Sequence, residues 1–281
     1  MEFLDFCRLH GVLIPHLPPA GKWKRYPTED HPKSRNGAVK WLGDVGFVQN
    51  HATMLDVAVW FPDRAQAASI DHAAIAARAA EGERLVQEGR KKAAAKALQV
   101  MQECQTGRHP YLERKGFPEE FGLVWTDGRL VIPMRVGREL VGLQVIDDDG
   151  DKKFLPGQRT SDAAFIIGDT RRRPIFCEGY ATALSLRLAL AACKMQACIV
   201  VCFSAHNVPK MAAKMPGGVV VADNDRSGTG ERVARQTGLP FWMPPTVGHD
   251  ANDCHLDYGI FFLSMALKRL LMEKPVYNRT C

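Results

Sequence analysis

The stretch PIFCEGYATALSLRLALAACKMQACIVVCFSAHNVPKMAAKMPGGVVVADND, residues 174–225, decides the fold. Within it, short apolar runs alternate with longer amphipathic segments: PIFCEG, TALSLRLALAA, ACIVVCF, PKMAAKM and GVVVADND. Such alternation is typical of a parallel sheet with helices on both faces. The following residues continue it with TGERVARQTG, PFWMPP and YGIFFLSMALKRLLME. We therefore predict an α/β domain here, with its last helix starting near Tyr258.

Composition limits the class of protein. The 281 residues are 46% apolar and 24% charged, which excludes intrinsic disorder and allows two compact units. No uncharged apolar run reaches the roughly 18 residues of a membrane span, and the start lacks a signal-peptide pattern, so we expect a cytoplasmic protein without a membrane partner. The eight cysteines include no C-x-x-C pair and indicate reduced core thiols. The formal charge of +6 suits a polyanionic partner.

The chain before the α/β domain divides into three segments. Residues 1–62 combine a short helix over 3–11 with aromatic and β-branched runs, which predicts a small unit of three or four antiparallel strands. Residues 63–108 are rich in Ala, Glu, Lys and Arg, which predicts one or two exposed helices that pack thinly as a connector. Residues 109–170 return to strands, in RLVIPMRV, ELVGLQVID and KKFLPG.

Acidic residues follow the predicted parallel strands, at the edge where ligands bind in open α/β sheets. Glu178 follows the first strand and Asp223 and Asp225 the third, and a later loop carries Asp250 and Asp253. Residues i and i+2 at a strand end point to the same side, so Asp223 and Asp225 can share a divalent cation. The small residues 226–230 then open a helix, whose free N–H groups would favour a phosphate. Asp250 and Asp253 are also good helix caps, and that alternative stays open.

Three segments carry a family resemblance: CEGYATALSL at 177–186, VVVADNDRSGTG at 219–230 and DANDCHLDYG at 250–259. They resemble the signature segments of the Toprim (topoisomerase and primase) domain. The preceding segment 127–157 is similar to the amino-terminal half of the catalytic core in bacterial and phage primases. The resemblance covers about residues 109–258 and is closest to Toprim proteins of phages, prophages and plasmids.

The resemblance implies a Rossmann-like Toprim sheet at 171–258, a primase subdomain at 109–170 and a final helix at 259–281. It implies catalytic roles for Glu178, Asp223 and Asp225. These three residues and Asp253 would bind Mg²⁺ or Mn²⁺, with the alternative that Glu178 serves as a general base. The third segment departs from the D-x-D pattern of cellular primases, since it reads Asp250-Ala251-Asn252-Asp253. Contacts to template and nucleotide would come from four cations: Arg135, Lys152, Lys153 and Arg159.

Primases of this kind carry an amino-terminal zinc ribbon, and residues 1–62 occupy its place. Cys7 and His10 are the only pair at suggestive spacing and lack a second pair, so no zinc is expected. Lys24 and Arg25 belong to a set of aromatic and basic residues suited to stacking bases and holding phosphates: Trp23, Lys24, Arg25, Tyr26, Lys40 and Trp41. Packing in the core of a small β unit explains Trp41, Phe47 and Trp60 equally well.

The expected function is that of a DNA primase, which makes short RNA primers from nucleoside triphosphates on single-stranded DNA during phage or plasmid replication. The chain has no G-x-x-x-x-G-K-[ST] loop, so the replicative helicase would be a separate polypeptide. Two alternatives stay open. One is a metal-dependent Toprim nuclease, and the other is a non-catalytic accessory protein that binds single strands and contacts a helicase through its apolar last helix.

Overall fold

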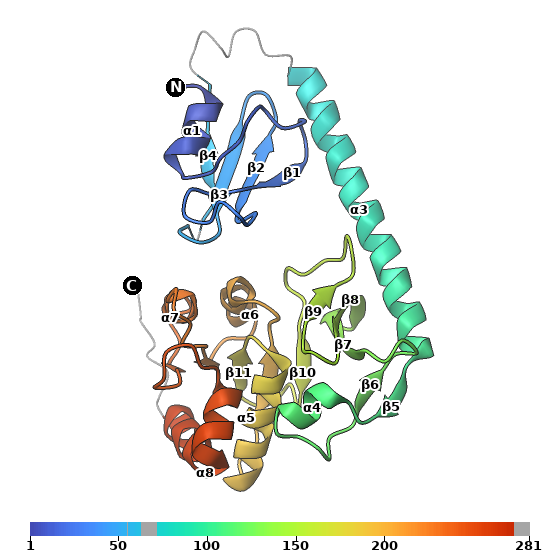
Figure 1. Cartoon of the computed structure of the whole chain (residues 1–281), viewed down its shortest axis with the longest axis vertical. Helices are drawn as coiled ribbons and strands as arrows, with labels where there is room; N and C mark the ends of the chain where they lie inside the picture. The colour runs from blue at the N-terminus through green and yellow to red at the C-terminus, as the bar shows by residue number, and fades with distance from the viewer. Residues whose placement is uncertain (55, 63–71, 273–281) are drawn as a thin grey trace. The chain divides into compact units, whose positions relative to one another are not determined.

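The computed structural model describes residues 1–54, 56–62 and 72–272, and the chain forms two compact units, Met1–Glu88 and Gly89–Cys281 (Figure 1). Part of the predicted connector, residues 63–71, and the end of the last predicted segment, residues 273–281, lie outside the described residues. Within the described part, no helix is long and apolar enough to cross a membrane.

The first unit is a four-stranded antiparallel sheet with one short helix. Its elements are α1 (Phe3–Leu9), β1 (Trp23–Tyr26), β2 (Gly37–Trp41), β3 (Gly46–Asn50) and β4 (Ala58–Trp60), with the strands in the order β1-β2-β3-β4. Its core is aromatic, because the ring of Phe3 stacks on Trp41 at 4.9 Å and Trp41 lies 5.4 Å from Trp60. The predicted antiparallel strands are confirmed.

Register in this sheet separates the aromatic residues that the sequence grouped together. Trp23 is opposite Lys40, and Lys40 is opposite Phe47, so these three side chains share one face of the sheet. Trp23 is 49% exposed. Trp60 is buried in the core and Trp41 packs against it, so the core alternative holds for these two; Phe47 is half-buried on the face of Trp23 and does not belong to that core. Tyr26 is buried in the core as well.

The helix α3 (His72–Glu103) runs unbroken through Gly82 and Gly89. The expectation of thin packing is wrong for its last turns. Ala97 and Val100 are fully buried against Val131, Leu143 and Val145. Alanine makes this possible, because its small side chain lets a helix approach a sheet closely.

The second unit contains two five-stranded sheets. The first is antiparallel in the order β5-β6-β7-β8-β9: β5 (Gln105–Gly107), β6 (Gly122–Val124), β7 (Leu130–Val136), β8 (Glu139–Ile146) and β9 (Lys152–Phe154), with α4 (Pro110–Arg114) between β5 and β6. The strands β7, β8 and β9 match the predicted ones, whereas β5, β6 and α4 were not predicted. A register shift at Met134/Arg135 turns the end of β7, so that Arg135 pairs with Ala164 and joins the two sheets.

The second sheet has the order β10-β12-β11-β13-β14, with β10 antiparallel and the other four strands parallel. Its strands are β10 (Phe165–Ile167), β11 (Pro174–Cys177), β12 (Cys198–Val201), β13 (Val219–Val221) and β14 (Phe241–Trp242). Its helices are α5 (Tyr180–Ala192), the 3-10 turn η1 (Ala205–Asn207), α6 (Val208–Lys214), α7 (Thr229–Gln236) and α8 (Ala251–Met272). The predicted alternation of strands and helices is confirmed.

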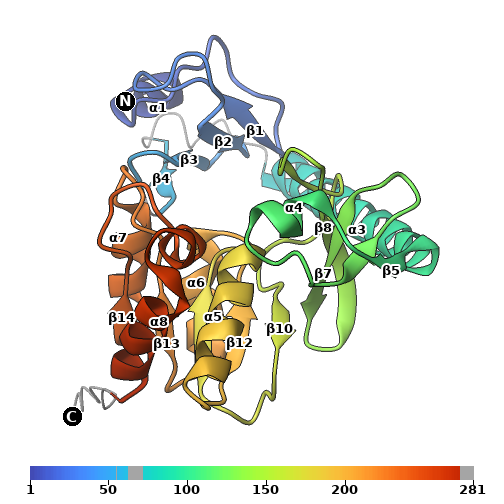
Figure 2. The same ribbon diagram turned by 60° about the horizontal axis from the view of Figure 1, so that its bottom comes forward.

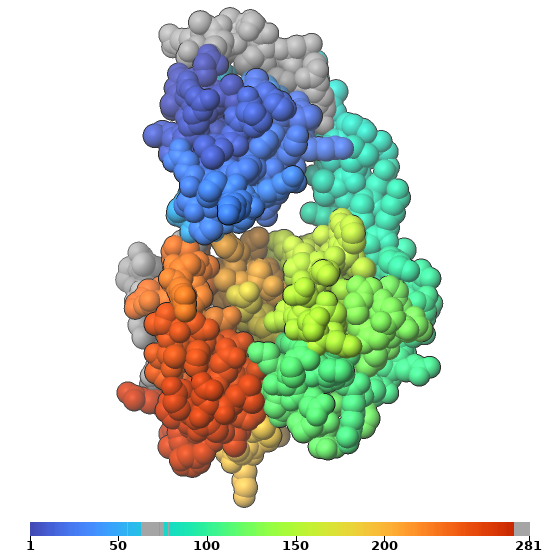
Figure 3. All heavy atoms as spheres, in the orientation of Figure 1, coloured from blue at the N-terminus to red at the C-terminus, as the bar shows by residue number. Residues whose placement is uncertain are grey.

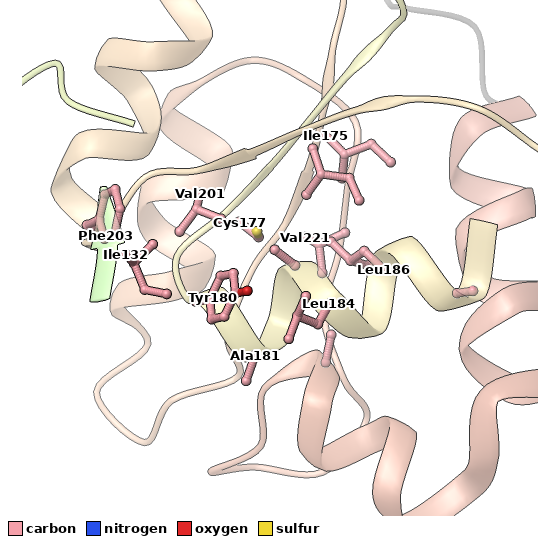
Figure 4. Packing of buried hydrophobic residues seen from close by; sticks show 14 of the residues in the cluster. Ile132, Ile175, Cys177, Tyr180, Ala181, Leu184, Leu186, Val201, Phe203 and Val221 are labelled. Atoms are coloured by element: carbon pink, nitrogen blue, oxygen red, sulfur yellow. The ribbon is translucent and has the colours of Figure 1, made fainter. Parts of the chain in front are cut away.

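Strand periodicity decides which helix covers which face. Ile175, Val201 and Val221 point into one cluster with α5 and α8, where Leu184 and Leu263 are fully buried (Figures 2 and 4). Phe176, Val200 and Val220 point to the other face, toward α6 and α7. Because neighbouring residues of a strand alternate between faces, continuous apolar strands are expected when helices cover both sides.

The last helix agrees with the prediction in part. Gly259, with φ 79° and ψ 163°, divides α8, and the segment after it begins close to Tyr258, where the last helix was expected. The segment before Gly259 begins at Ala251. The Asp250 carboxylate starts it by accepting the backbone N–H groups of Asn252 and Asp253. Part of the outer surface of α8, red in Figure 3, is apolar, with Phe261 76% and Met265 51% exposed. The predicted contact between this helix and a helicase stays a prediction.

Candidate active site

Glu178 and Asp223 lie at the carboxyl ends of β11 and β13, which are neighbours in the parallel sheet. Burial raises the pKa of both carboxyls, and that of Asp223 reaches about 8. Glu178 and Asp250 raise the pKa of Asp223 further, so these carboxylates are close enough to repel each other. The structure therefore brings together the acidic residues of the first two signature segments.

The Asp223 carboxylate is incompletely satisfied. Its Oδ1 is buried and accepts no hydrogen bond from a described residue. Glu178, in contrast, accepts the backbone N–H of Ala205, the first residue of η1. A buried oxygen without a donor is costly unless a cation or a protonated group meets it. Asp223 is thus the carboxylate with the greatest need for a ligand.

Asp225 differs from Asp223 in its hydrogen bonds, and its predicted catalytic and metal-binding roles stay predictions. Its Oδ1 accepts the N–H groups of Ser227 and Thr229, and its Oδ2 accepts that of Gly230 at 2.6 Å. Burial alone would raise the pKa of Asp225, but these bonds and the Ser227 hydroxyl outweigh it and lower the pKa. The expectation of free N–H groups at the start of this helix is wrong, because the Asp225 side chain occupies them.

Gly230 allows this arrangement. A Cβ at this position would lie 2.0 Å from the carbonyl oxygen of Asp223, closer than any side chain tolerates. The absence of a side chain brings the first turn of α7 against the strand end. Between the two aspartates, the Asn224 side chain donates to the Pro244 carbonyl at 2.9 Å.

The third acidic segment caps α8. Asp250 accepts the N–H of Asp253, and Asp253 Oδ2 returns a bond by accepting the N–H of Asp250 at 3.0 Å. This reciprocal pattern supports the capping alternative for both residues. The Asp253 Oδ1 also lies 3.7 Å from Lys115 Nζ. A metal role for Asp253 stays a prediction, whereas Asp250 acts electrostatically on both Glu178 and Asp223.

Buried Asn252 fixes the capping loop in place. Its Nδ2 donates to the Lys115 carbonyl at 2.8 Å and to Ser185 Oγ at 3.1 Å. Through these bonds the loop is tied to α5 and to the turn after α4. No pattern in the sequence predicts that Asn252 holds this loop, because the role depends on side-chain contacts to distant segments.

Lys152 is the cation that meets the acidic residues. It lowers the pKa of Glu178 and of Asp223, partly offsetting the effect of burial. Its ammonium lies 5.9 Å from the centre of the Tyr111 ring, which also helps to hold it. Lys152 therefore lies near the acidic residues, and its contact to template or nucleotide stays a prediction.

The other predicted cations lie elsewhere. Lys153 is the next residue along β9, and its side chain leaves the opposite side of the strand. Arg135 is exposed and donates to the carbonyl of Arg138 at 3.0 Å. Arg159 pairs with Asp162 at 2.8 Å. In the first unit Lys24 and Arg25 are exposed on β1, with the Lys24 ammonium 5.6 Å from the Tyr26 ring centre. Their binding roles stay predictions.

The residue types suit a hard divalent cation, but they do not enclose one. In residues 1–54, 56–62 and 72–272, no three His, Cys, Asp or Glu side chains lie close enough together to hold a metal ion. Mg²⁺ commonly binds through one or two carboxylates and keeps several waters. Glu178 and Asp223 fit that pattern, because both are half-buried and the buried Asp223 Oδ1 has no donor among the described residues. Cys7 and His10 are the one pair at zinc-ligand spacing in the sequence. Cys7 is fully buried in the first unit, and the His10 ring lies beside Phe6.

Comparison with known proteins gives partial structural likenesses alone. No protein-family model matches the chain, and no curated protein matches it. The primase fragment of the bacteriophage T7 primase-helicase protein is 18% identical, with a TM-score of 0.38, over 58% of this chain and 68% of that one.

A second likeness is to a chain in the structure of bacteriophage T7 lagging-strand DNA polymerase interacting with primase domains of two gp4 subunits bound to an RNA/DNA hybrid and dTTP. It is 15% identical, with a TM-score of 0.42, over 61% of this chain and 93% of that one.

Proposed function

We propose that the chain is a Toprim-type DNA primase that joins nucleoside triphosphates into short primers on single-stranded DNA. One observation carries the proposal: half-buried Glu178 and Asp223 converge with Lys152 at the carboxyl edge of a parallel sheet. Converging carboxylates with a single cation favour a divalent metal ion and, beside it, a phosphate. The resemblance of three segments to the Toprim signatures names the same residues.

Each residue has a role that follows from its surroundings. Glu178 and Asp223 would hold Mg²⁺ or Mn²⁺, with Asp225 and Asp253 fixing the loops on either side. When bound, the ion would supply activation of an attacking hydroxyl and charge neutralisation at the leaving pyrophosphate. Lys152 would contact a phosphate of the incoming nucleotide, since its ammonium already lies within reach of the carboxylates. A separate helicase would provide the single strand.

Primer synthesis tests the proposal directly. The purified chain is incubated with single-stranded DNA of mixed sequence, labelled ribonucleoside triphosphates and Mg²⁺ or Mn²⁺, and products are resolved on a gel. Wild type should give short labelled oligomers, and Asp223→Asn and Glu178→Gln should each reduce them at least about 100-fold. Asp169→Asn is the matched control, because Asp169 pairs with Arg171 before the first parallel strand.

Two results would contradict the proposal. If Asp223→Asn and Glu178→Gln make primers as fast as the wild type, these carboxylates are not catalytic. If wild type instead shortens labelled DNA without nucleotides, in a metal-dependent reaction that Asp223→Asn abolishes, the chain is a nuclease. Asparagine is used at position 223 because it keeps the shape of the side chain.

A further inference from the structure

A second set of charged side chains lies on the face of the parallel sheet covered by α6 and α7. We call it the basic cluster, and its members come from η1, α6, α7 and the loop before β10: Arg159, His206, Lys210, Lys214 and Arg232. In Figure 1, α6 and α7 run side by side, and α7 packs against both η1 and α6. None of these residues except Arg159 was singled out from the sequence as a binding residue.

Ion pairs and hydrogen bonds place the members of the basic cluster near one another. Arg159 and Lys214 both pair with the Asp162 carboxylate, at 2.8 and 2.7 Å. The Lys210 ammonium donates to Ser161 Oγ at 3.0 Å, one residue away. After burial, Arg232 and Lys210 are the main causes that lower the pKa of His206. Contacts from two helices and a loop thus converge on one patch of surface.

The positive charge in this cluster exceeds the negative charge. Asp162 is the only carboxylate that pairs with its members within the described part of the chain, and it already serves two of them. Lys210 and Arg232 form no ion pair with a described carboxylate. The buried Nε of Arg232 has no acceptor, and its Nη2 reaches only Thr229 Oγ1 at 3.0 Å. Cations that repel each other favour an anionic ligand.

The cluster is built on a rigid support. Buried Asn207 donates from Nδ2 to the carbonyls of Ala163 and Cys202, at 2.8 and 2.9 Å. Its Oδ1 accepts the N–H of Asp162, a residue that holds a positive φ of 65°. One side chain therefore fixes the loop of Arg159 against η1. A surface that is ordered before binding loses less entropy when it binds.

The support also links the cluster to the carboxylate site. The N–H of Ala205, at the start of η1, bonds to the Glu178 carboxylate, and Phe203 N donates to the Glu178 carbonyl at 2.9 Å. His206 follows Ala205 directly in the chain. A phosphate on the basic cluster would therefore lie on the same edge of the unit as Glu178.

We propose that the basic cluster binds phosphate oxyanions next to the carboxylate site, and that Lys210 and Arg232 are its main contacts. This inference rests on the proposed function for its physiological ligand. The same oxyanion chemistry is offered by the backbone of a single-stranded nucleic acid and by the triphosphate of a nucleotide. The experiment has one arm for each source.

The first arm measures binding of a fluorescent oligothymidylate of about 12 nucleotides, in EDTA and without nucleotides, over a series of salt concentrations. The second measures binding of a fluorescent ATP analogue under the same conditions. The variant is Lys210→Gln with Arg232→Gln. The control is Arg172→Gln with Lys268→Gln, which removes the same charge from an exposed turn before β11 and from an exposed position on α8. Melting temperatures confirm that both variants fold.

If the ligand is a nucleic-acid backbone, the variant should bind the oligonucleotide about tenfold more weakly at low salt. Its slope of log K against log salt should fall by about 1.4, because each contact to a single strand contributes about 0.7. If the ligand is a triphosphate, the loss should occur in the second arm instead. Wild-type affinity and slope in both arms would overturn the inference. Neither arm requires primer synthesis, so its failure is distinct from failure of the proposed function.

Discussion

At the scale of single residues, Asp223 and Asp225 stand two positions apart but have opposite pKa shifts. Asp223 is buried near other carboxylates without a donor to its Oδ1, so its pKa rises to about 8. Asp225 lies under three backbone N–H groups, so its pKa falls. The D-x-D spacing predicts that both side chains reach one edge of the sheet. It does not predict which of the two carboxylates accepts hydrogen bonds from the backbone N–H groups.

We expect the stability of the metal-free protein to fall as the pH rises, partly because of Asp223. Its pKa in the folded state exceeds the unfolded value of about 3.9, so its contribution is complete below pH ~4 and is lost as the pH rises toward 8. Asp223→Asn should flatten this loss, which is at most about 1.4 kcal/mol per pH unit. Thermal melts in EDTA at several pH values measure it.

Asp225→Asn provides the control for that measurement. It should destabilise the protein by about 1 kcal/mol near neutral pH, because it weakens the cap of α7. Since the folded-state pKa of Asp225 is lowered, its contribution is present above the unfolded pKa and is lost in acid. Identical pH profiles for wild type and Asp223→Asn would contradict the assignment of the raised pKa to Asp223.

At the scale of elements, glycines in α7 and α3 allow a matched test of packing. A Cβ on Gly230 would meet the Asp223 carbonyl at 2.0 Å, whereas a Cβ on Gly89 would meet nothing closer than 3.8 Å. Gly230→Ala should therefore cost about 1–3 kcal/mol of unfolding free energy. Gly89→Ala should stabilise the helix by up to about 1 kcal/mol. Urea titrations give both values, and a neutral Gly230→Ala would refute the close approach.

The α/β elements were predictable because both strand and helix patterns are strong between residues 174 and 242. Continuous apolar runs such as Cys198–Val201 occur where both faces are covered, and the structure shows clusters on both sides. Short elements were missed: β5 (Gln105–Gly107) has no apolar alternation and depends on pairing with β6. The segment of α8 before Gly259 was not predicted as a helix, because Asp250 and Asp253 suit metal ligands as well as helix caps.

The candidate site was predictable in part for the same reason. Strand ends can be read from a sequence, and they place Glu178 and Asp223 together. Lys152 reaches the site through the pairing of β9 with β8, and Lys153 does not, although the two residues are chemically equal. Asn207 and Arg232 carried no sequence signal, because their importance lies in hydrogen bonds and charges contributed by distant segments.

At the scale of the whole molecule, the cysteines report on both units. All seven cysteines in the described residues are free, and burial raises the pKa of Cys7 to about 12 and of Cys254 to about 11. Iodoacetamide at pH 8 should therefore modify the half-buried Cys104 and Cys193 well before the buried thiols. Peptide mass spectrometry of the alkylated protein measures the order, and early labelling of Cys177 would contradict the buried core.

The same thiols can follow unfolding of each unit. Cys7 belongs to the small aromatic core of the first unit, and Cys177 to the larger cluster that joins the strands to α5 and α8. A smaller core stabilises its unit less, so Cys7 should become reactive at a lower urea concentration than Cys177. Pulse labelling across a urea series measures both midpoints, and coincident midpoints would show that the two units unfold together.

The cap that Asp225 provides for α7 affects how fast a ligand can bind beside it. An anion site at the start of a helix can become ordered only when its ligand binds, and part of the binding free energy is then used to order the loop. Here the Asp225 carboxylate itself accepts the backbone N–H groups at the helix start, so the conformation of residues 225–230 is fixed by hydrogen bonds within the protein. For the ion proposed at Asp223, we therefore expect the rate of binding to depend on the ion's own loss of water rather than on ordering of residues 225–230.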